Sequence, residues 1–242
     1  MKLIIRNNLY SQLLRHAISV LFALISLTGC AHTQPTNDPF EQINRRIYSF
    51  NTFADRTVIR PIAVAYQQVI PEIFRSRIGN VFDTASYPLV FINQFLQGKF
   101  ETGIRDAGRF IINSTIGSAG LFDVASSLGL SKNSEDFGQT LGVWGLASGP
   151  YLMLPLLGPA TFRDGVGDIA DYYGQLNTFT DHVPTRNVVN VIYFIDLRQR
   201  LLAAERLLSG DKYLFTRDAY LQQRHFEVID GKTKGDPFLD ER

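Results

Sequence analysis

The sequence predicts an all-α protein. Two patterns support this prediction, and one stretch of the chain departs from them. After residue 38, apolar residues recur at the three- and four-residue spacing of amphipathic helices along most of the chain. No alternating series of apolar and polar residues predicts a strand, and no segment repeats another. The exception is an uncharged stretch rich in Gly and Pro, Phe137–Phe162, whose composition allows one short hairpin. We therefore predict a single helical domain over 38–230 and a polar, flexible tail over 231–242.

The N-terminal residues have the pattern of a lipoprotein signal peptide. A basic segment, Met1–Arg15, precedes an apolar run, Ala17–Leu27, that is too short for a permanent membrane helix. The run ends in the lipobox-like motif LTGC at Cys30, where the small residue before the cysteine permits cleavage. We predict that 1–29 are removed, that Cys30 becomes the acylated first residue, and that 30–37 form a tether.

Composition limits the partners and the chemistry of the mature chain. Cys30 is the only cysteine, which excludes an intrachain disulfide and a site built on several thiolates. Three of the 24 Lys and Arg residues lie in the leader, so the mature chain has a net charge of about −2 and no electrostatic footprint for nucleic acid. Ala31, rather than Asp, follows the lipidated cysteine. By the sorting rule of Gram-negative lipoproteins, this favours the outer membrane, with the chain facing the periplasm.

Helical spacing predicts the elements of the domain in order. Asp38 as N-cap and Pro39 as first residue begin a helix that continues through Phe40–Ala54. Pro61 and Pro71 open two short helical segments. Six further helices are predicted, over 75–96 with a kink at Pro88, 100–112, 121–128, 163–173, 187–208 and 212–229.

The uncharged stretch Phe137–Phe162 leaves two interpretations open. It has the length to cross a bilayer, which requires about 20 apolar residues, but Pro150, Pro155 and Pro159 break it. Broken backbone occurs at membrane depth only where protein buries it or where it lines a cavity. The stretch therefore indicates either a passage within lipid or a buried core loop of a soluble domain.

No motif predicts catalysis, a cofactor or a metal. The sequence contains neither a nucleophile elbow nor a phosphate-binding glycine loop with lysine. A histidine–serine pair of His182 and Ser148 is conceivable, but nothing in the sequence singles it out. Asp164, Asp168 and Asp171 share one helix face. They form either a cation or acid–base site, or an exposed helix face whose carboxylates pair at most with a nearby arginine such as Arg163. We favour the second interpretation, in which they also orient the preceding stretch.

Four arginines on apolar helical stretches are candidates for contact with phosphate headgroups. The guanidinium group binds phosphate through a planar fork of donors. The alternative is that these side chains only extend toward water from an apolar surface. The candidates are Arg45, Arg46, Arg105 and Arg109.

Six blocks, in order, carry a resemblance to a known family. They are DPFEQINRRIYSFN (38–51), IRPIAVAY (59–66), FLQGKF (95–100), FIINSTIGSAGLFDVA (110–125), GPYLMLPLLGPATFRDGVGDIAD (149–171) and RDAYLQQRHF (217–226). The ordered set resembles the MlaA (VacJ) family of outer-membrane lipoproteins over nearly the whole mature chain.

The resemblance implies a fold and a function. Members of the family are helical rings lying in the outer membrane around an amphipathic central channel. They remove glycerophospholipids from the outer leaflet and pass them to the periplasmic carrier MlaC, from which an inner-membrane ABC complex receives them. The resemblance also implies association with trimeric porins of the OmpC/OmpF type. The rival interpretations are a porin-binding scaffold that moves no lipid and, with less support, a phospholipase.

The resemblance also implies site residues. To these residues we add a physical hypothesis, in which apolar side chains of the matching block contact acyl tails and its Gly and Pro backbone contacts the headgroup. Candidates for channel lining are Tyr151, Leu152, Met153, Leu154, Pro155, Leu156 and Leu157. Candidates for channel support or gating are Tyr48, Phe50, Asn51 and Phe53.

Overall fold

The computed structural model describes residues 38–175, 182–207 and 210–231. The chain divides into two units, Met1–Asp38 and Pro39–Arg242, and every described residue except Asp38 belongs to the second. The predictions for the signal peptide, for Cys30, for the tether and for the tail after residue 231 lie outside the described residues.

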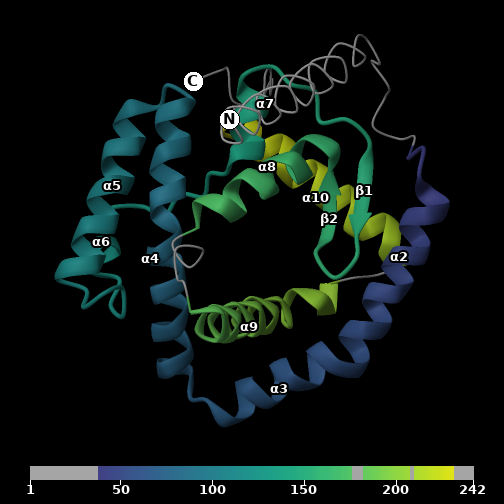
Figure 1. Cartoon of the computed structure of the whole chain (residues 1–242), viewed down its shortest axis with the longest axis horizontal. Coiled ribbons are helices and arrows are strands. Elements are labelled where there is room, and N and C mark those ends of the chain that lie inside the picture. Colours follow the sequence, from purple (N-terminus) through teal and green to yellow (C-terminus); the bar gives the residue numbers. More distant parts are fainter. Residues whose placement is uncertain (1–37, 176–181, 208–209, 232–242) are drawn as a thin grey trace, which may run out of the picture. The chain divides into compact units, whose positions relative to one another are not determined.

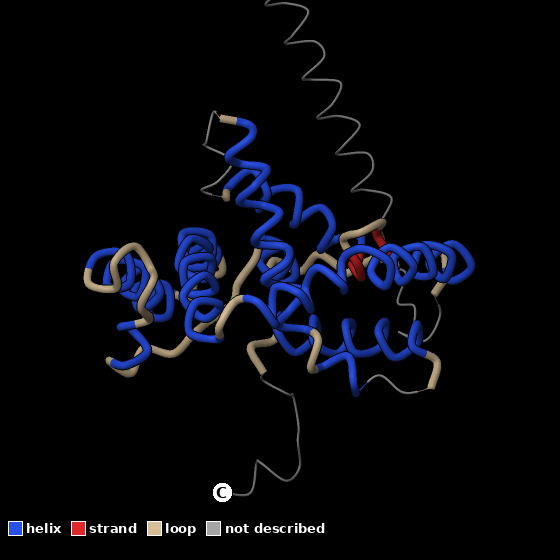
Figure 2. Tube along the Cα trace, turned by 90° about the horizontal axis from the view of Figure 1, so that it is seen from below, coloured by secondary structure: helices blue, strands red, loops and turns tan. Residues whose placement is uncertain are grey.

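The prediction of an all-α fold is confirmed. Helices account for most of the described chain, and the strands found there form one antiparallel pair (Figure 2). In the unit Pro39–Arg242 the helices follow one another in a ring-like arrangement (Figure 1). In the part of the chain that the structure describes, none of the helices combines the length and the apolar character needed to span a bilayer.

The first helical path runs without interruption through three elements. Helix α2 (Glu41–Ala54) continues into a π-helix, η1 (Asp55–Ile59), and then into α3 (Arg60–Val69). The wider turn ends where Pro61 follows, and it relieves the clash of the proline ring with the backbone of the preceding turn. The predicted start was two residues early, because Phe40 is the N-cap and its carbonyl accepts the first backbone hydrogen bonds.

Three helices follow after Pro71. Helix α4 (Glu72–Leu96) remains one continuous helix through Pro88, and α5 (Phe100–Thr115) packs along it through Phe91 and Phe110. Short α6 (Val124–Ser127) is capped by the carboxylate of Asp123, which accepts from the backbone N–H of Ser126 at 3.1 Å.

The uncharged stretch forms a helix and the hairpin that the sequence allowed. Helix α7 (Phe137–Val143) precedes strands β1 (Tyr151–Leu154) and β2 (Gly158–Thr161), paired in register from Tyr151 with Thr161 to Leu154 with Gly158. Helix α8 (Phe162–Gly174) follows directly. A Cβ atom on Gly167 would lie 2.4 Å from the backbone nitrogen of Gly138, so this glycine permits α7 and α8 to pack closely.

The last helices differ from their predicted bounds. Helix α9 (Val183–Leu201) begins four residues earlier than predicted, because the imidazole of His182 caps it and Pro184 fits its first turn. It ends at Leu201, and a 3₁₀ turn, η3 (Ala204–Leu207), takes the place of its predicted final residues. Helix α10 (Lys212–Val228) is capped by Asp211, whose carboxylate accepts from the N–H groups of Tyr213 and Leu214.

The interior of this unit is more polar than its exterior. Among the described residues, 15 polar or charged residues are buried, against eight apolar ones, and 38 large apolar residues are exposed. Helix α5 shows the inversion most clearly, because its buried face carries Asp106, Arg109 and Asn113 while Ile104 and Ile111 are exposed. A water-soluble helix shows the opposite pattern.

Candidate functional site

The hairpin is joined to α2 by two asparagine side chains. Asn44 donates to the carbonyl of Tyr151 at 3.1 Å and accepts from the N–H of Met153 at 2.9 Å. The outer edge of β1 would otherwise expose these groups, and the amide of Asn44 satisfies them as a neighbouring strand would. The side chain of Asn44 is buried, so this contact belongs to the core.

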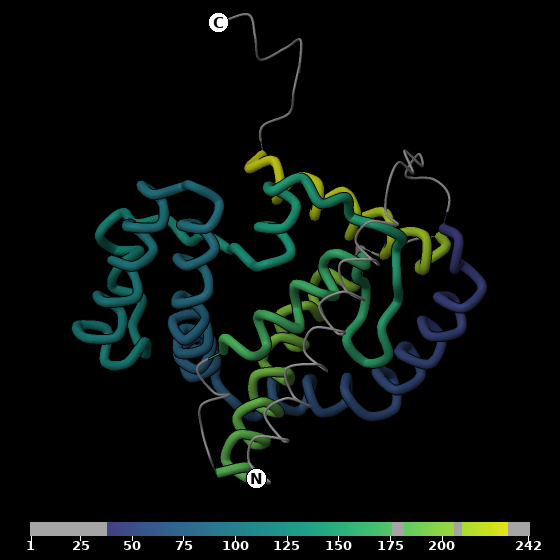
Figure 3. The backbone as a smooth tube through the Cα atoms, turned by 45° about the horizontal axis from the view of Figure 1, so that its top comes forward, coloured from purple at the N-terminus to yellow at the C-terminus, as the bar shows by residue number. Residues whose placement is uncertain are grey.

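Asn51 repeats the same contact two turns along the helix. It donates to the carbonyl of Leu154 at 2.9 Å and accepts from the N–H of Leu156 at 2.8 Å. Asn44 and Asn51 are seven residues apart and therefore lie on one face of α2. Figure 3 shows this helix running beside the hairpin.

The seven predicted lining residues divide between the base and the tip of the hairpin. Tyr151 and Met153 form a buried cluster with Tyr213 and are only 4% and 3% exposed, so their assignment to an open passage is wrong. They face inward because side chains alternate along a strand. Leu152 and Leu154 are half-buried.

The tip contains the accessible residues of this set. Pro155 is exposed, as are Leu156 and Leu157, at 52% and 79%. Leu156 has a φ of 63°, a left-handed conformation that is uncommon for a side chain of this type. The hydrogen bond from its N–H to Asn51 fixes this turn to α2.

The four residues predicted to support or gate a channel have different surroundings. Asn51 holds the hairpin tip, and the ring of Tyr48 packs edge-on against Tyr213 with centroids 5.7 Å apart. Phe50 and Phe53 are exposed, at 52% and 68%. The structure thus brings Tyr48 and Asn51 to the hairpin and leaves the two phenylalanines on the exposed surface of α2.

A charge cluster fixes the base of the hairpin. Asp164 accepts from Arg224 at 2.9 Å, from Arg163 at 2.8 Å and from the hydroxyls of Thr161 and Tyr220. Arg224 also donates to both carboxylate oxygens of Asp136, at 2.6 and 2.9 Å. Burial alone would raise the pKa of Asp164, but the bonds from Arg224 and Thr161 outweigh it and hold this pKa well below its ordinary value.

Two of the three aspartates of α8 have structural roles, and Asp168 is exposed. Asp164 pairs with arginine, as the favoured interpretation allowed, and Asp171 accepts from the backbone N–H of Phe137 at 2.8 Å, which orients the start of α7. Desolvation, with the nearby charge of Asp136, raises the pKa of Asp168 to about 6. No group of three or more potential metal ligands occurs within 38–175, 182–207 and 210–231.

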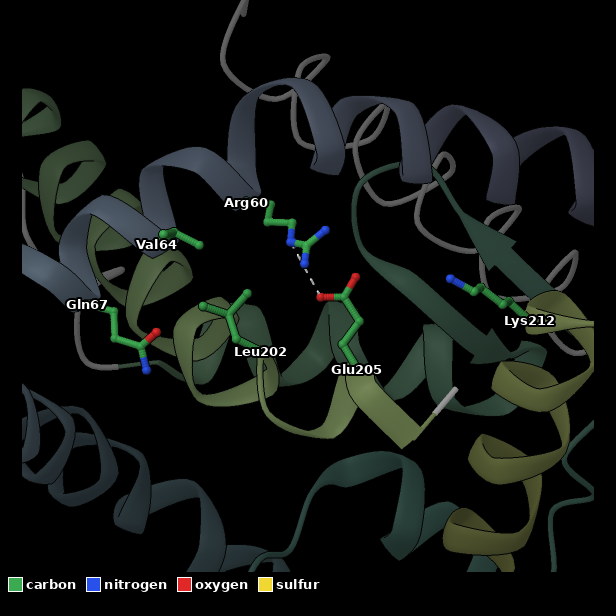
Figure 4. Close-up of a pocket in the computed structure, with 6 residues that line it drawn as sticks. All are labelled: Arg60, Val64, Gln67, Leu202, Glu205 and Lys212. Atoms are coloured by element: carbon green, nitrogen blue, oxygen red, sulfur yellow. Dashed lines mark ion pairs between the residues drawn. The ribbon is translucent and has the colours of Figure 1, made fainter. Parts of the chain in front are cut away.

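A hollow of about 350 Å³ lies between α3, the segment after α9 and the start of α10 (Figure 4). Val64 and Leu202 form the apolar part of its wall, and the side chains of three charged residues and one glutamine line the rest. Its volume is within the range of small-molecule sites, about 300–1,000 Å³. The lining residues are Arg60, Val64, Gln67, Leu202, Glu205 and Lys212.

The charged side chains in and beside the hollow differ in how strongly they are paired. Arg60 lies 3.8 Å from the carboxylate of Glu205, the longest ion pair described, and its side chain is 51% exposed. Arg198 is held more firmly, because it donates to both carboxylate oxygens of Asp55 at 2.6 and 2.7 Å and to Glu205 at 3.1 Å. Lys212 has no side-chain partner among the side chains that the structure describes. Sequence reasoning missed this site, because its residues come from three separate segments.

Four arginines were predicted to contact lipid headgroups, and the prediction for Arg109 is wrong. Its side chain is fully buried and donates to Tyr87, Asp123 and the carbonyl of Leu130, so it cannot meet a headgroup. Its position on the apolar-looking α5 misled the prediction, because the polar face of that helix points inward.

The other three arginines lie at or near the surface. Arg45 pairs with Glu41 and Asp211 and lies over the ring of Tyr213, and Arg105 pairs with Glu101. Arg46 is exposed beside the apolar residues of α2. Of the four, only Arg46 has no ion pair among the described residues, which leaves it free to meet a phosphate.

The outward surfaces of α2 to α5 carry many large apolar side chains among polar ones. Exposed side chains recur along each helix, and isolated exposed apolar residues are normal whereas contiguous surfaces of them mark contact with lipid or protein. The most exposed examples are Phe53, Val69, Ile73, Phe74, Phe100, Ile104 and Ile111, with Ile116 directly after α5.

A ring-like helical arrangement with a polar interior and an apolar exterior defines a class of proteins that contact lipid or another apolar partner through their outer surface. Comparison with known proteins identifies the family within that class. Residues 36–227 match the family described as MlaA lipoprotein, and the chain belongs to this family.

Named relatives and a solved structure agree with this assignment. The chain is 35% identical to "Intermembrane phospholipid transport system lipoprotein MlaA" of Escherichia coli K12, covering 86% of each chain. It is 31% identical to the protein of the same name from Haemophilus influenzae, covering 89% of this chain and 91% of that one. A structure reported under the heading "Structural basis for maintenance of bacterial outer membrane lipid asymmetry" matches with a TM-score of 0.71 and 34% identity, over 79% of this chain and 99% of that chain.

Proposed function

We propose that this protein removes misplaced glycerophospholipids from the outer leaflet of the outer membrane and passes them toward the periplasm, which maintains lipid asymmetry. Two observations support this function. The relatives are named for intermembrane phospholipid transport, and the similar solved structure is described in terms of outer membrane lipid asymmetry. The observation that carries it is the inverted burial, because a polar interior within an apolar exterior suits a protein that lies in lipid and offers a polar path through it.

The proposed location is the outer membrane. Lipidation at Cys30 would anchor the chain, since two or more acyl chains give a stable anchor. The exposed apolar residues of α2 to α5 would contact the hydrocarbon, and Arg46 would reach a headgroup phosphate from the surface of α2. A glycerophospholipid is the proposed ligand, the periplasmic carrier MlaC the proposed recipient, and trimeric porins of the OmpC/OmpF type the proposed membrane partners.

The proposed passage uses the hairpin tip and the hollow. Leu156 and Leu157 offer apolar contact for acyl tails, while Arg60 and Lys212 offer donors for the headgroup. The sequence has no nucleotide-binding motif, so the chain itself supplies no energy for transport. Net direction must then come from differential affinity for lipid elsewhere in the pathway.

The test is the phospholipid content of the outer leaflet in cells that lack this protein, in cells with it restored, and in cells that carry Leu157→Arg. We expect accumulation on loss, reversal by the wild type, and no reversal by Leu157→Arg, because a charge at the tip repels the acyl tails. Leu157→Met is the matched control and should restore asymmetry. An unchanged outer leaflet in cells without the protein would overturn the transport function.

The same variants separate transport from the two rivals. A porin-binding scaffold predicts association with porin without lipid bound to the purified protein, and it predicts that Leu157→Arg behaves as wild type. A phospholipase predicts lysophospholipid and free fatty acid when the protein meets vesicles. The structure gives the latter little support, because His182 caps α9 through Thr185 rather than activating a nucleophile.

A further inference from the structure

We propose that the hollow beside α3 selects phospholipid headgroups that carry both a phosphodiester and a primary ammonium group. In this arrangement Arg60 and Lys212 bind the phosphodiester, and Glu205 binds the ammonium. The inference rests on the proposed function, since it assigns the headgroup class to the lipid that the protein would move.

Two cations of the hollow are available to a phosphate. Among the side chains that the structure describes, Lys212 has no partner and Arg60 is paired only with Glu205, at 3.8 Å. An ion pair of that length between a half-exposed arginine and a carboxylate contributes little to stability. A phosphodiester can therefore replace Glu205 as the partner of Arg60 with little loss of stability. It then accepts charge-assisted hydrogen bonds from both Arg60 and Lys212.

Glu205 gives the hollow its selectivity. Its carboxylate accepts from Arg198 at 3.1 Å, but Arg198 is already committed to both oxygens of Asp55. Once a phosphodiester takes Arg60, Glu205 loses one of its two cationic partners. A primary ammonium on the same headgroup replaces that partner, and the exchange leaves the charge of the hollow balanced.

The same carboxylate acts against a headgroup without an ammonium group. An anionic phosphodiester such as that of phosphatidylglycerol would take Arg60 and leave Glu205 underpaired beside a second negative charge. A quaternary ammonium, as in phosphatidylcholine, brings the charge but no N–H to donate. The hollow should therefore prefer phosphatidylethanolamine to both.

The shape of the hollow fits a headgroup rather than a whole lipid. Its volume of about 350 Å³ is at the lower end of the range for ligand sites. Val64 and Leu202 provide apolar wall next to the charged residues, where the glycerol and the first carbons of the tails would lie (Figure 4). The tails themselves must lie outside the hollow.

The test uses the full mature chain in detergent micelles, mixed with equimolar phosphatidylethanolamine, phosphatidylglycerol and phosphatidylcholine. The bound lipids are separated with the protein and quantified by mass spectrometry. We expect the wild type to enrich phosphatidylethanolamine roughly tenfold over phosphatidylglycerol, the effect of one charge-assisted hydrogen bond. Glu205→Gln should bring this ratio close to one without reducing total bound lipid, and Arg60→Gln and Lys212→Gln should reduce the total for every headgroup.

Matched controls exist on the same elements. Arg56→Gln changes an exposed arginine one turn before Arg60 outside the hollow, and Glu72→Gln changes an exposed glutamate at the start of α4. Both should bind lipid as the wild type does. The wild-type comparison of phosphatidylethanolamine with phosphatidylcholine tests the inference even if a variant fails to fold.

The outcomes separate the two proposals. Lipid bound by the wild type without discrimination among the three headgroups overturns the inference and leaves the proposed function intact, as does a preference that Glu205→Gln preserves. A folded wild type that binds no phospholipid at all counts against the proposed function itself.

Discussion

The base and the tip of the hairpin are three to six residues apart and have opposite environments. At the base, Tyr151 and Met153 lie in the core and Thr161 enters the charge cluster around Asp164. At the tip, Leu156 and Leu157 are exposed, and Asn51 joins this turn to α2. The comparison shows how one short element can be fixed firmly at one end and still present apolar side chains at the other.

The largest expected effect comes from placing the same charge at each end. Met153→Arg buries an unpaired cation in the core and should lower the free energy of unfolding by about 4–5 kcal/mol or prevent folding. Leu157→Arg should change it by less than about 0.5 kcal/mol, because the tip is exposed. Chemical denaturation in detergent micelles measures both, and equal destabilisation by the two variants would contradict the comparison.

The charge cluster at the base should be nearly as sensitive. Arg224→Ala leaves Asp136 and Asp164 without their shared cation, and removing one partner of a buried pair costs about 3–5 kcal/mol. Arg56→Ala, at an exposed position of η1, is the control and should have almost no effect. The thermal midpoints of both variants check this, and a stable Arg224→Ala protein would show that the cluster does not hold the hairpin.

The two asparagines give a graded test within one helix face. Asn44→Ala leaves a buried carbonyl and a buried N–H unsatisfied and should cost about 2–4 kcal/mol. Asn51→Ala should cost only about 0.5–1.5 kcal/mol, because water can reach the N–H of exposed Leu156. Asn51→Ala should nevertheless impair removal of outer-leaflet lipid more than its stability loss explains, and normal removal would argue against a role for the tip.

The smallest expected effect is a pH dependence from Asp168. Its folded pKa of about 6 lies above its ordinary value of 3.8, so the folded protein binds more protons than the unfolded chain between these values. Stability should therefore fall as pH rises through this window, by less than about 1 kcal/mol because the side chain is exposed. Unfolding at pH 4.5 and pH 7.5 measures the fall. Asp168→Asn should make it smaller and leave the part that the raised pKa values of Asp106, Glu135 and Asp171 contribute.

Helical spacing predicted most elements because periodicity depends only on neighbouring residues. The hairpin was anticipated from the Gly and Pro punctuation of its stretch. Helical spacing did not show which face of a helix points inward. In α5, Ile104 is exposed and Arg109 is buried, and the packing of neighbouring elements, not the sequence of α5, determines this. The same limit produced the error at Arg109 and the assignment of Tyr151 and Met153 to a passage.

The contacts that define the site join residues far apart in the chain. Asn44 meets Met153 across 109 residues, and the bond from Arg198 to Asp55 spans 143. No local pattern marks either pair. One usable signal was present, since Asn44 and Asn51 share a helix face at a spacing of seven, where a buried face would ordinarily be apolar.

The π-helix Asp55–Ile59 determines how the chain tolerates a change in its length. Its backbone bond runs from the N–H of Arg60 to the carbonyl of Asp55, five residues back, so this turn contains one residue more than an α-turn. Because a wide turn and a regular turn both complete one revolution, deleting one residue here would convert the π-helix to a regular turn and keep α2 and α3 close to their present phase. The same deletion in the last regular turn of α2 would rotate everything after it by about 100°. Asn44 and Asn51 would then keep the hairpin while Arg60 turned away from the hollow. The wide turn is thus the point on this helical path that can lose one residue without separating the hairpin from the hollow.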